Sequence, residues 1–348
     1  MTLSRFFGLS LYLLAVCLAA NGQTQTPSVP AAKQADKSGD GYEYFVVGNP
    51  ADASRKTSPG ALLMGGGTDV AAAFQWLIGK AGGGDIVVLR ASGTDAYNPY
   101  INKLGAVDSV ETLIVKSRAA AADDFVVNKV RNAEAIFIAG GAQSNYVKFW
   151  QGTPLADAVN QAVAKGVPIG GTSAGLAILG EFSFPALGGS ATSAEALANP
   201  FVGSVTLARD FLRVPGLQGV ITDSHFVERD RMGRLLTFLA RLAQDGWVKP
   251  RAKSVSLKGI GIDRETALLV EADGTISVRG KNAAYFISVS SAPKICRANT
   301  PLTFRRLSVF KLAGEGTFSL KTWQGQSGAS YIISVEKGAL VSSTGSVY

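Results

Sequence analysis

One serine in this sequence has neighbours that suit a catalytic nucleophile. Residues 171–175 read Gly-Thr-Ser-Ala-Gly, after the apolar segment 167–169 and before the apolar run 176–179. Between a strand and a helix, small neighbours permit the tight turn that lifts the hydroxyl of Ser173 above the sheet. The backbone N–H of Ala174 would then face the reacting oxygen, where a helix N-terminus favours negative charge. A plain glycine-rich turn is the alternative interpretation.

A second pair of glycines favours the catalytic interpretation. Gly140 and Gly141 follow the apolar run 135–138, and Gln143 comes two residues later. Glycines at the carboxyl end of a parallel strand let backbone N–H groups approach a ligand in the crevice where such sheets bind. The N–H of Gly141 is a candidate second oxyanion donor, and Gln143 a candidate for orienting substrate. The same glycines would also suit an ordinary turn.

The sequence contains one histidine, His225, at the end of the apolar segment 220–222. A single imidazole excludes a zinc site built from several histidines. A lone histidine is usually structural or merely exposed. If Ser173 is activated by a histidine of its own chain, however, His225 is that general base.

The acid that would orient His225 is not fixed by spacing. Glu195 lies between the serine and the histidine, and Glu181, Asp210 and Asp223 are competitors. Asp223 is close in sequence, but residues two apart on a strand point the same way without necessarily touching.

Two arginines follow the histidine at helical spacing. Arg231 and Arg234 are three residues apart, so they would share a helix face. Two guanidinium groups beside a catalytic serine suit a substrate that carries carboxylates, because each can bind a carboxylate through two hydrogen bonds. A solvated basic helix face is the alternative.

Short apolar runs alternate with helical patterns along most of the chain. The predicted strands cover residues 44–47, 85–89, 113–115, 135–138 and 167–169, and the predicted helices cover 70–81 and 154–164. This alternation predicts an α/β fold with a doubly wound, mostly parallel sheet covered on both faces. Beyond about residue 267, short β-type runs separated by Gly, Asp and Ser predict a β-rich C-terminal part over 267–348.

Composition describes an ordinary globular protein. Of 348 residues, 47% are hydrophobic and 17% charged, which argues against intrinsic disorder. The formal net charge is +8, but the basic residues are scattered, so no nucleic-acid partner is expected.

Residues 1–22 have the pattern of an export signal. Arg5 precedes an apolar stretch at 6–20 that is too short to span a membrane, and small residues follow. We therefore expect no membrane span and a cleaved, exported protein, periplasmic or extracellular. Attachment of a lipid at Cys17 is the less favoured alternative, because Val16 is large where a lipobox usually has a small residue.

The segment after the signal predicts a linker. Residues 23–42 have few large apolar side chains and cannot bury enough surface to order themselves, so the folded domain is expected over 43–348. After cleavage Cys296 would be the sole cysteine, so no internal disulfide is expected.

Four motifs in this order resemble a known family. They are Gly140-Gly141-x-Gln143, the pentapeptide 171–175, Asp223-x-His225-Phe226 with Arg229, Arg231 and Arg234, and residues 259–267, Gly-Ile-Gly-Ile-Asp-Arg-Glu-Thr-Ala. Together they are similar to the S51 serine peptidases, the family of cyanophycinase and peptidase E, over about residues 60–320.

The resemblance implies a fold similar to the class I glutamine amidotransferases and hydrolysis of peptide bonds that involve aspartate. Cyanophycinases release β-Asp-Arg dipeptides from a polymer with an aspartate backbone and arginine on each β-carboxyl. No metal or organic cofactor is implied, and a homodimer is suggested.

The resemblance also assigns roles by position. It implies that Ser173 is the nucleophile, His225 the base and Glu195 the acid, since the family's glutamate also follows a Gly-Gly-Ser stretch. Gln143, Asp223, Arg231 and Arg234 match substrate-contacting positions, whereas the motif 259–267 is expected to build the core without taking part in chemistry. Ala142 and Ser224 depart from the family, which has Asp and Gln at these two positions.

Two other functions fit parts of the pattern. An α/β-hydrolase esterase shares the order serine, acid, histidine, but the chain continues from 226 to 348 and lacks a His-Gly-Gly-Gly motif. A non-catalytic periplasmic binding module on this fold is the other alternative. The presence of both the elbow serine and a histidine argues against it.

Overall fold

The computed structural model describes residues 35–248 and 257–348, and residues 35–348 form one compact unit. The expected export signal, Cys17 and most of the expected linker lie outside the described residues. The end of that linker is ordered, contrary to expectation: β1 (Lys37–Gly39) pairs antiparallel with β2 (Tyr42–Gly48). Polar composition concealed this pairing, because an exposed edge strand needs few apolar residues.

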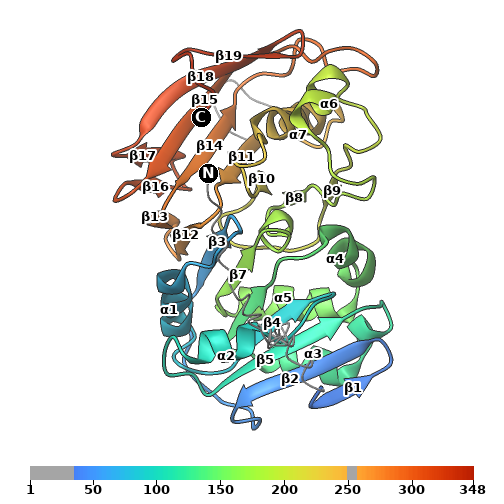
Figure 1. The fold of residues 1–348 in the computed structure, drawn as a ribbon, viewed down its shortest axis with the longest axis vertical. Coiled ribbons are helices and arrows are strands. Elements are labelled where there is room, and N and C mark those ends of the chain that lie inside the picture. The colour runs from blue at the N-terminus through green and yellow to red at the C-terminus, as the bar shows by residue number, and fades with distance from the viewer. Residues whose placement is uncertain (1–34, 249–256) are drawn as a thin grey trace, which may run out of the picture. The chain divides into compact units, whose positions relative to one another are not determined.

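The strands form two sheets rather than one (Figure 1). In spatial order, the first sheet contains β1, β2, β5 (Ser109–Val115), β4 (Ile86–Arg90), β6 (Ala135–Ile138), β7 (Ile169–Thr172), β3 (Gly60–Met64), β12 (Thr266–Glu271), β13 (Thr275–Gly280), β16 (Thr317–Ser319) and β17 (Gln324–Gln326). Its central strands, from β5 to β3, are parallel, and antiparallel strands extend it at both ends.

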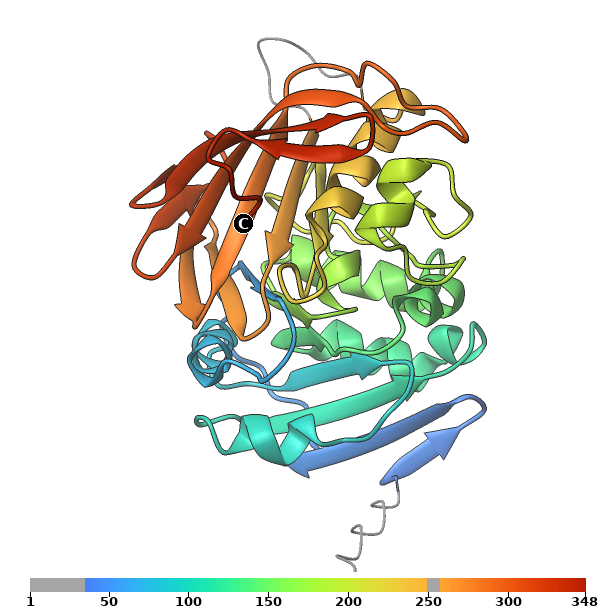
Figure 2. The same cartoon turned by 45° about the horizontal axis from the view of Figure 1, so that its top comes forward.

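The second sheet contains the strand before the histidine. In spatial order it consists of β19 (Ala339–Ser342), β18 (Ala329–Glu336), β15 (Phe304–Ala313), β14 (Ala283–Val289), β11 (Leu257–Ile262), β10 (Val220–Asp223), β8 (Phe182–Ser183) and β9 (Ala208–Arg209). β10 is parallel to β11 and β8, and the pairings from β11 to β19 are antiparallel. The β-rich C-terminal part, whose strands are orange and red in Figure 2, therefore divides between both sheets.

Helices cover both faces of the parallel strands. The helices are α1 (Ala71–Lys80), α2 (Tyr97–Asn102), α3 (Asp124–Asn132), α4 (Gln143–Trp150), α5 (Pro154–Ala164), α6 (Ser193–Ala198) and α7 (Met232–Gln244). Along β3, Leu62 packs with α1 and α2, while the next residue, Leu63, packs with α3 and α5. Successive side chains of a strand point to opposite faces, so this alternation produces the doubly wound core that the sequence predicts.

The second sheet is also packed on two sides. One face joins α6 and α7 in a core that includes Ile221 and Leu235. The other face, with Ile260 and Phe286, contributes to the core of the first sheet. No helix within the described ranges is long and apolar enough to cross a membrane.

Candidate active site

Ser173 lies on a strained turn directly after β7. Its φ of 52° is in the left-handed region, which non-glycine residues rarely adopt. A Cβ on Gly171 would lie 2.7 Å from the carbonyl carbon of Gly175, and one on Gly175 would lie 2.1 Å from the oxygen of Ile138. Neither glycine has room for a side chain, so the backbone folds as a nucleophile elbow requires. The helix expected after it is one 3-10 turn, Leu176–Ile178.

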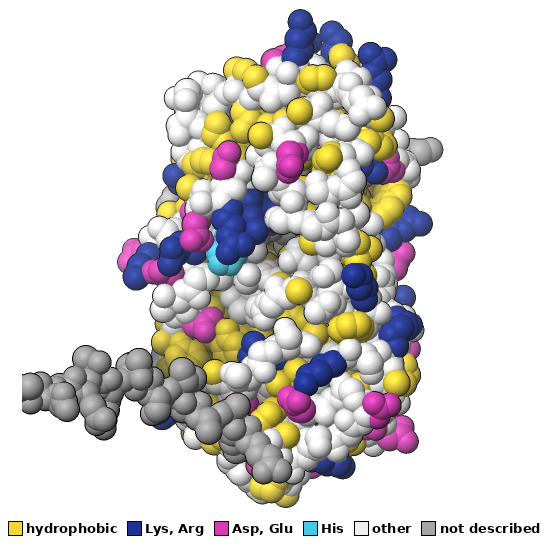
Figure 3. Space-filling model, turned by 45° about the vertical axis from the view of Figure 1, so that its right-hand side comes forward, with side chains coloured by type: hydrophobic (Ala, Val, Ile, Leu, Met, Phe, Trp, Pro, Cys, Tyr) yellow, Lys and Arg dark blue, Asp and Glu magenta, His cyan; other side chains and the backbone are white. Residues whose placement is uncertain are grey.

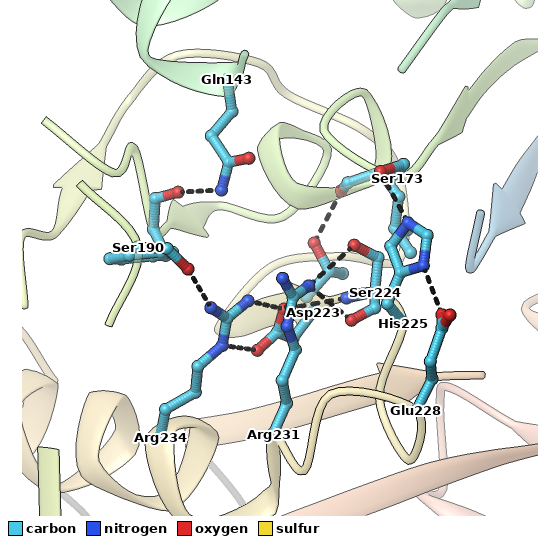
Figure 4. Close-up of polar contacts among 12 residues, drawn as sticks. Gln143, Ser173, Ser190, Asp223, Ser224, His225, Glu228, Arg231 and Arg234 are labelled. Atoms are coloured by element: carbon cyan, nitrogen blue, oxygen red, sulfur yellow. Dashed lines mark hydrogen bonds and ion pairs between the residues drawn. The ribbon is translucent and has the colours of Figure 1, made fainter. Parts of the chain in front are cut away.

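The carboxyl end of β3 holds the backbones of both the serine and the histidine. The N–H of Ser173 donates to the oxygen of Met64 at 3.1 Å, and that of His225 donates to the oxygen of Gly65 at 2.8 Å. His225 also has a positive φ, 46°, in the turn that follows β10. These two bonds bring residues from different sheets together, and Oγ of Ser173 lies 3.0 Å from Nε2 of His225 (Figure 4).

Gly66, which the sequence analysis did not single out, supports the imidazole. Its φ is +91°, and a Cβ there would lie 2.4 Å from Nε2 of His225. The ring therefore packs directly on this backbone. The run of three glycines at 65–67, directly after the apolar residues 61–64, was a signal of close backbone approach.

The acid beside the histidine is Glu228, three residues further along the same turn. Its Oε2 lies 2.9 Å from Nδ1 of His225, so serine, imidazole and carboxylate form one continuous chain (Figure 4). Asp263, which is buried, accepts the N–H of Val227 at 3.0 Å, while the N–H of Phe226 donates to the oxygen of Ile262. The segment after β11 thus holds the backbone that carries Glu228.

Glu195, the acid expected from the resemblance, makes no hydrogen bond to His225 among the described residues. It lies at the start of α6, where its carboxylate accepts the N–H and hydroxyl of Thr192 in a capping box. The remaining candidates also bond elsewhere: Glu181 accepts the N–H of Gly219, and Asp210 pairs with its neighbour in sequence. The Gly-Gly-Ser stretch at 188–190 therefore precedes a helix N-terminus that Glu195 caps.

The charges around the imidazole suit a general base. Burial lowers the pKa of His225, and the positive charges of Arg229 and Arg231 lower it further, while the hydrogen bond to Glu228 opposes them. The bond to His225 and, to a smaller extent, the charge of Arg264 lower the pKa of Glu228. At neutral pH the imidazole is therefore neutral and the glutamate ionised, which favours a proton on Nδ1 and leaves Nε2 free to accept one.

The turn with the two expected oxyanion glycines lies beside the serine. A Cβ on Gly140 would be 3.5 Å from Cβ of Ser173. The hydroxyl of Tyr146 donates to the oxygen of Ala139 at 2.8 Å and also reaches that of Gly140, which fixes the turn. Within the described residues, neither the N–H of Gly141 nor that of Ala174 has a hydrogen-bond partner. Their joint role as oxyanion donors stays a prediction.

Three of the four expected substrate-contacting residues, Asp223, Arg231 and Arg234, form an ion-pair cluster. Arg234 is 1% exposed and binds both carboxylate oxygens of Asp223, at 2.7 and 2.5 Å, and it also donates to the oxygen of Ala191. Arg231 precedes α7 instead of sharing its helical face, and donates to the oxygen of Ser224 at 2.7 Å and to Asp223 at 3.3 Å. Asp223 and Arg234 therefore neutralise each other in the interior.

Arg231 and Gln143 lie nearer the surface. Burial lowers the pKa of Arg231 to about 10, so it remains a cation at neutral pH. Nε2 of Gln143 donates to the oxygen of Phe184 at 2.9 Å, so this amide is already engaged. The histidine, cyan in Figure 3, lies next to a group of lysine and arginine side chains. In the described ranges, no cluster of three or more His, Cys, Asp or Glu side chains could hold a metal ion.

Comparison with known proteins places the chain in a family. The model of peptidase family S51 matches residues 69–190, which include Gly141 and Ser173 but end before His225. A cyanophycinase of Geminocystis herdmanii is 31% identical over 240 residues, 67% of this chain and 79% of its own. A cyanophycinase of Synechococcus elongatus is 30% identical over 235 residues, 66% of each chain.

A solved structure shares the fold. The crystal structure of a peptidase from an acI-B1 Actinobacterium has a TM-score of 0.50 and 17% identity, and the alignment covers 75% of this chain and 97% of that one. Together with the sequence relatives, this agrees with the expected α/β fold and enzyme class. The chain belongs to peptidase family S51 and is a cyanophycinase-like serine peptidase.

Proposed function

We propose that this peptidase cleaves aspartyl or β-aspartyl-arginine peptides through an acyl-enzyme, with Ser173 as nucleophile, His225 as base and Glu228 as the orienting acid. The observation that carries the proposal is the chain of two contacts, 3.0 Å from Oγ to Nε2 and 2.9 Å from Nδ1 to Oε2. Both distances are within the range for direct proton transfer and for orienting the base.

The reaction follows from these positions. His225 Nε2 takes the proton from the hydroxyl of Ser173 while the oxygen attacks the substrate carbonyl. Charge then develops on the carbonyl oxygen, which we assign to the N–H groups of Gly141 and Ala174. Glu228 stabilises the imidazolium, which gives its proton to the leaving amine. Water, activated by the same imidazole, then hydrolyses the ester on Ser173.

The substrate class rests on the relatives and on charge. The two relatives described above are named cyanophycinases. Arg231 supplies a cation two positions beyond Arg229 and beside the base, which suits a substrate rich in carboxylates. Ser224, where the resembling family has Gln, accepts a 3.3 Å contact from Arg231 through its hydroxyl. It is therefore placed to change which side chain this cation binds.

Hydrolysis of purified cyanophycin tests the proposal, with the Ser173→Ala protein as control. Release of β-Asp-Arg by the wild type alone would support nucleophile, reaction and substrate together. Release by both proteins would contradict the role of Ser173. If the folded wild type reacts with a fluorophosphonate but releases nothing, cyanophycin is excluded, and isoaspartyl dipeptides are the next substrates to assay.

We also propose that the protein is exported. The pattern of residues 1–22 supports this: a positive charge, a short apolar stretch and small residues before the polar segment. Sequencing the N-terminus of the protein from the periplasm or medium tests it. A first residue near position 23 is expected, whereas an intact Met1 on cytoplasmic protein would contradict export.

A further inference from the structure

Glu228 occupies an unusual place for an acid that must hold a catalytic base. Its side chain is 36% exposed, and it lies on a turn rather than in the interior. An exposed glutamate has several rotamers and can turn toward water, so one hydrogen bond to an imidazole fixes it poorly. Something else must restrict this carboxylate if it is to act in every turnover.

Arg264 contacts the oxygen that the histidine leaves free. Its Nη1 donates to Oε1 of Glu228 at 3.2 Å, while Oε2 of the same carboxylate faces Nδ1 of His225 at 2.9 Å. The carboxylate is thus held at both oxygens, by a cation on one side and by the base on the other. Bonds at both oxygens restrict rotation of the carboxylate, which a single bond does not.

The guanidinium is itself held by a second carboxylate. Nη2 of Arg264 donates to Oε1 of Glu265 at 3.2 Å, and Oε2 of Glu265 pairs with Lys281 at 2.6 Å. Glu265 has a φ of 53°, and its N–H donates to the oxygen of Gly66 at 2.7 Å. Charges alternate along Glu228, Arg264, Glu265 and Lys281, and networks of this kind are more effective than isolated surface pairs.

The turn formed by residues 263–265 contacts the site at three points. Asp263 binds the backbone beside Glu228, Arg264 binds the side chain of Glu228, and Glu265 binds the glycine on which the imidazole rests. These are consecutive residues between β11 and β12, in the motif 259–267 that the sequence analysis assigned to the core alone. The motif therefore has a role beyond packing.

We infer that Arg264 is a positioning residue, which holds the carboxylate of Glu228 directed at His225 by binding its other oxygen. The inference rests on the proposed function, because it takes Glu228 as the acid that orients His225. Arg264 itself does not contact His225 in any hydrogen bond among the described residues, so it acts through the glutamate.

The charged groups that face His225 and Glu228 decide in which direction the loss of Arg264 shifts the pH dependence of the rate. His225 faces Glu228, Arg229 and Arg231, while Glu228 faces His225, Arg229 and Arg264. Removing the charge of Arg264 raises the pKa of Glu228 and leaves that glutamate's charge less compensated, which also raises the pKa of His225. Activity needs both groups deprotonated, so the acid limb of the rate profile should move to higher pH.

The experiment is a cycle of variants in the full protein: Arg264→Gln, Glu228→Gln and both together. The readout is the rate constant for inactivation by a fluorophosphonate, which reports on Ser173 without a natural substrate. Arg264→Gln should slow inactivation about fivefold, and Arg264→Lys should restore most of the loss, since it keeps the charge. In the Glu228→Gln background, Arg264→Gln should add nothing.

Arg305→Gln is the matched control. Arg305 makes an exposed pair with Glu336 through two contacts, at 2.6 and 2.8 Å, on strands β15 and β18. The Arg305→Gln variant loses the same charge and the same kind of ion pair as Arg264→Gln. It should be inactivated by the fluorophosphonate at the wild-type rate. Far-UV circular dichroism and thermal melting of all variants confirm that each is folded.

The failures are distinguishable. The inference is overturned if Arg264→Gln reacts like Arg305→Gln, or if its loss is undiminished in the Glu228→Gln background while Glu228→Gln alone is slow. If Glu228→Gln itself reacts at the wild-type rate, the proposed acid fails and the inference fails with it. Reaction at another residue in place of Ser173 contradicts the proposed function whatever Arg264 does.

Discussion

Replacing each candidate acid in turn distinguishes Glu195, which the resemblance favours, from Glu228, which the structure favours. Glu228→Gln keeps the shape of the side chain and removes the charge 2.9 Å from the imidazole. Charge centres about 4 Å apart interact by about 4 kcal/mol at an effective dielectric constant of about 20. The carboxylate is 36% exposed, so screening reduces this to roughly 2–3 kcal/mol. Because about 1.4 kcal/mol corresponds to a factor of ten, the loss in kcat/KM should be roughly 100-fold.

The comparison variant is Glu195→Gln. Glu195 caps α6 through Thr192 and makes no bond to His225. This variant should keep the wild-type rate and lose only a little thermal stability. Both variants are assayed by fluorophosphonate inactivation and by hydrolysis of a β-aspartyl-arginine substrate. A Glu228→Gln protein within threefold of the wild type, alongside an inactive Glu195→Gln protein, would refute the assignment made from the geometry.

Three further outcomes follow from the same contacts. Burial lowers the pKa of His225 below its ordinary 6.5, and the base must be neutral, so the inactivation rate should hold above this pKa and fall only below about pH 6.5. Gly66→Ala places a Cβ 2.4 Å from Nε2, so the imidazole must move, and the rate constant should fall roughly 100-fold. Asp223→Ala leaves the buried charge of Arg234 unpaired and should lower the free energy of unfolding in urea by about 3–5 kcal/mol. Glu336→Ala, which breaks an exposed pair, should barely shift the same transition.

The elbow serine was predictable because its requirements are local. Two glycines flank Ser173 at fixed spacing, and each has no room for a Cβ. The doubly wound core was predictable for a similar reason, because the alternation of short apolar runs with helical patterns is visible in the sequence. The division of the C-terminal strands between two sheets was not predictable. Strands far apart in sequence pair according to which sheet edges remain free, and the local pattern does not show this.

The acid was not predictable because its position depends on a turn. Glu228 contacts His225 within a turn in which His225 has a positive φ and Asp263, far along the chain, accepts the N–H of Val227. Helical spacing likewise related Arg231 to Arg234, but it could not show that both converge on the buried Asp223. Periodicity indicates which residues share a face and says nothing of what lies opposite them.

Identification of the residue that a fluorophosphonate modifies tests the central claim most directly. The wild-type protein and His225→Ala are treated at pH 7.5, digested and analysed by mass spectrometry of the peptide that contains residues 171–175. The account predicts one adduct on Ser173 in the wild type and almost none in His225→Ala, with both proteins folded. A folded wild type without an adduct, or equal labelling of the two proteins, would contradict it.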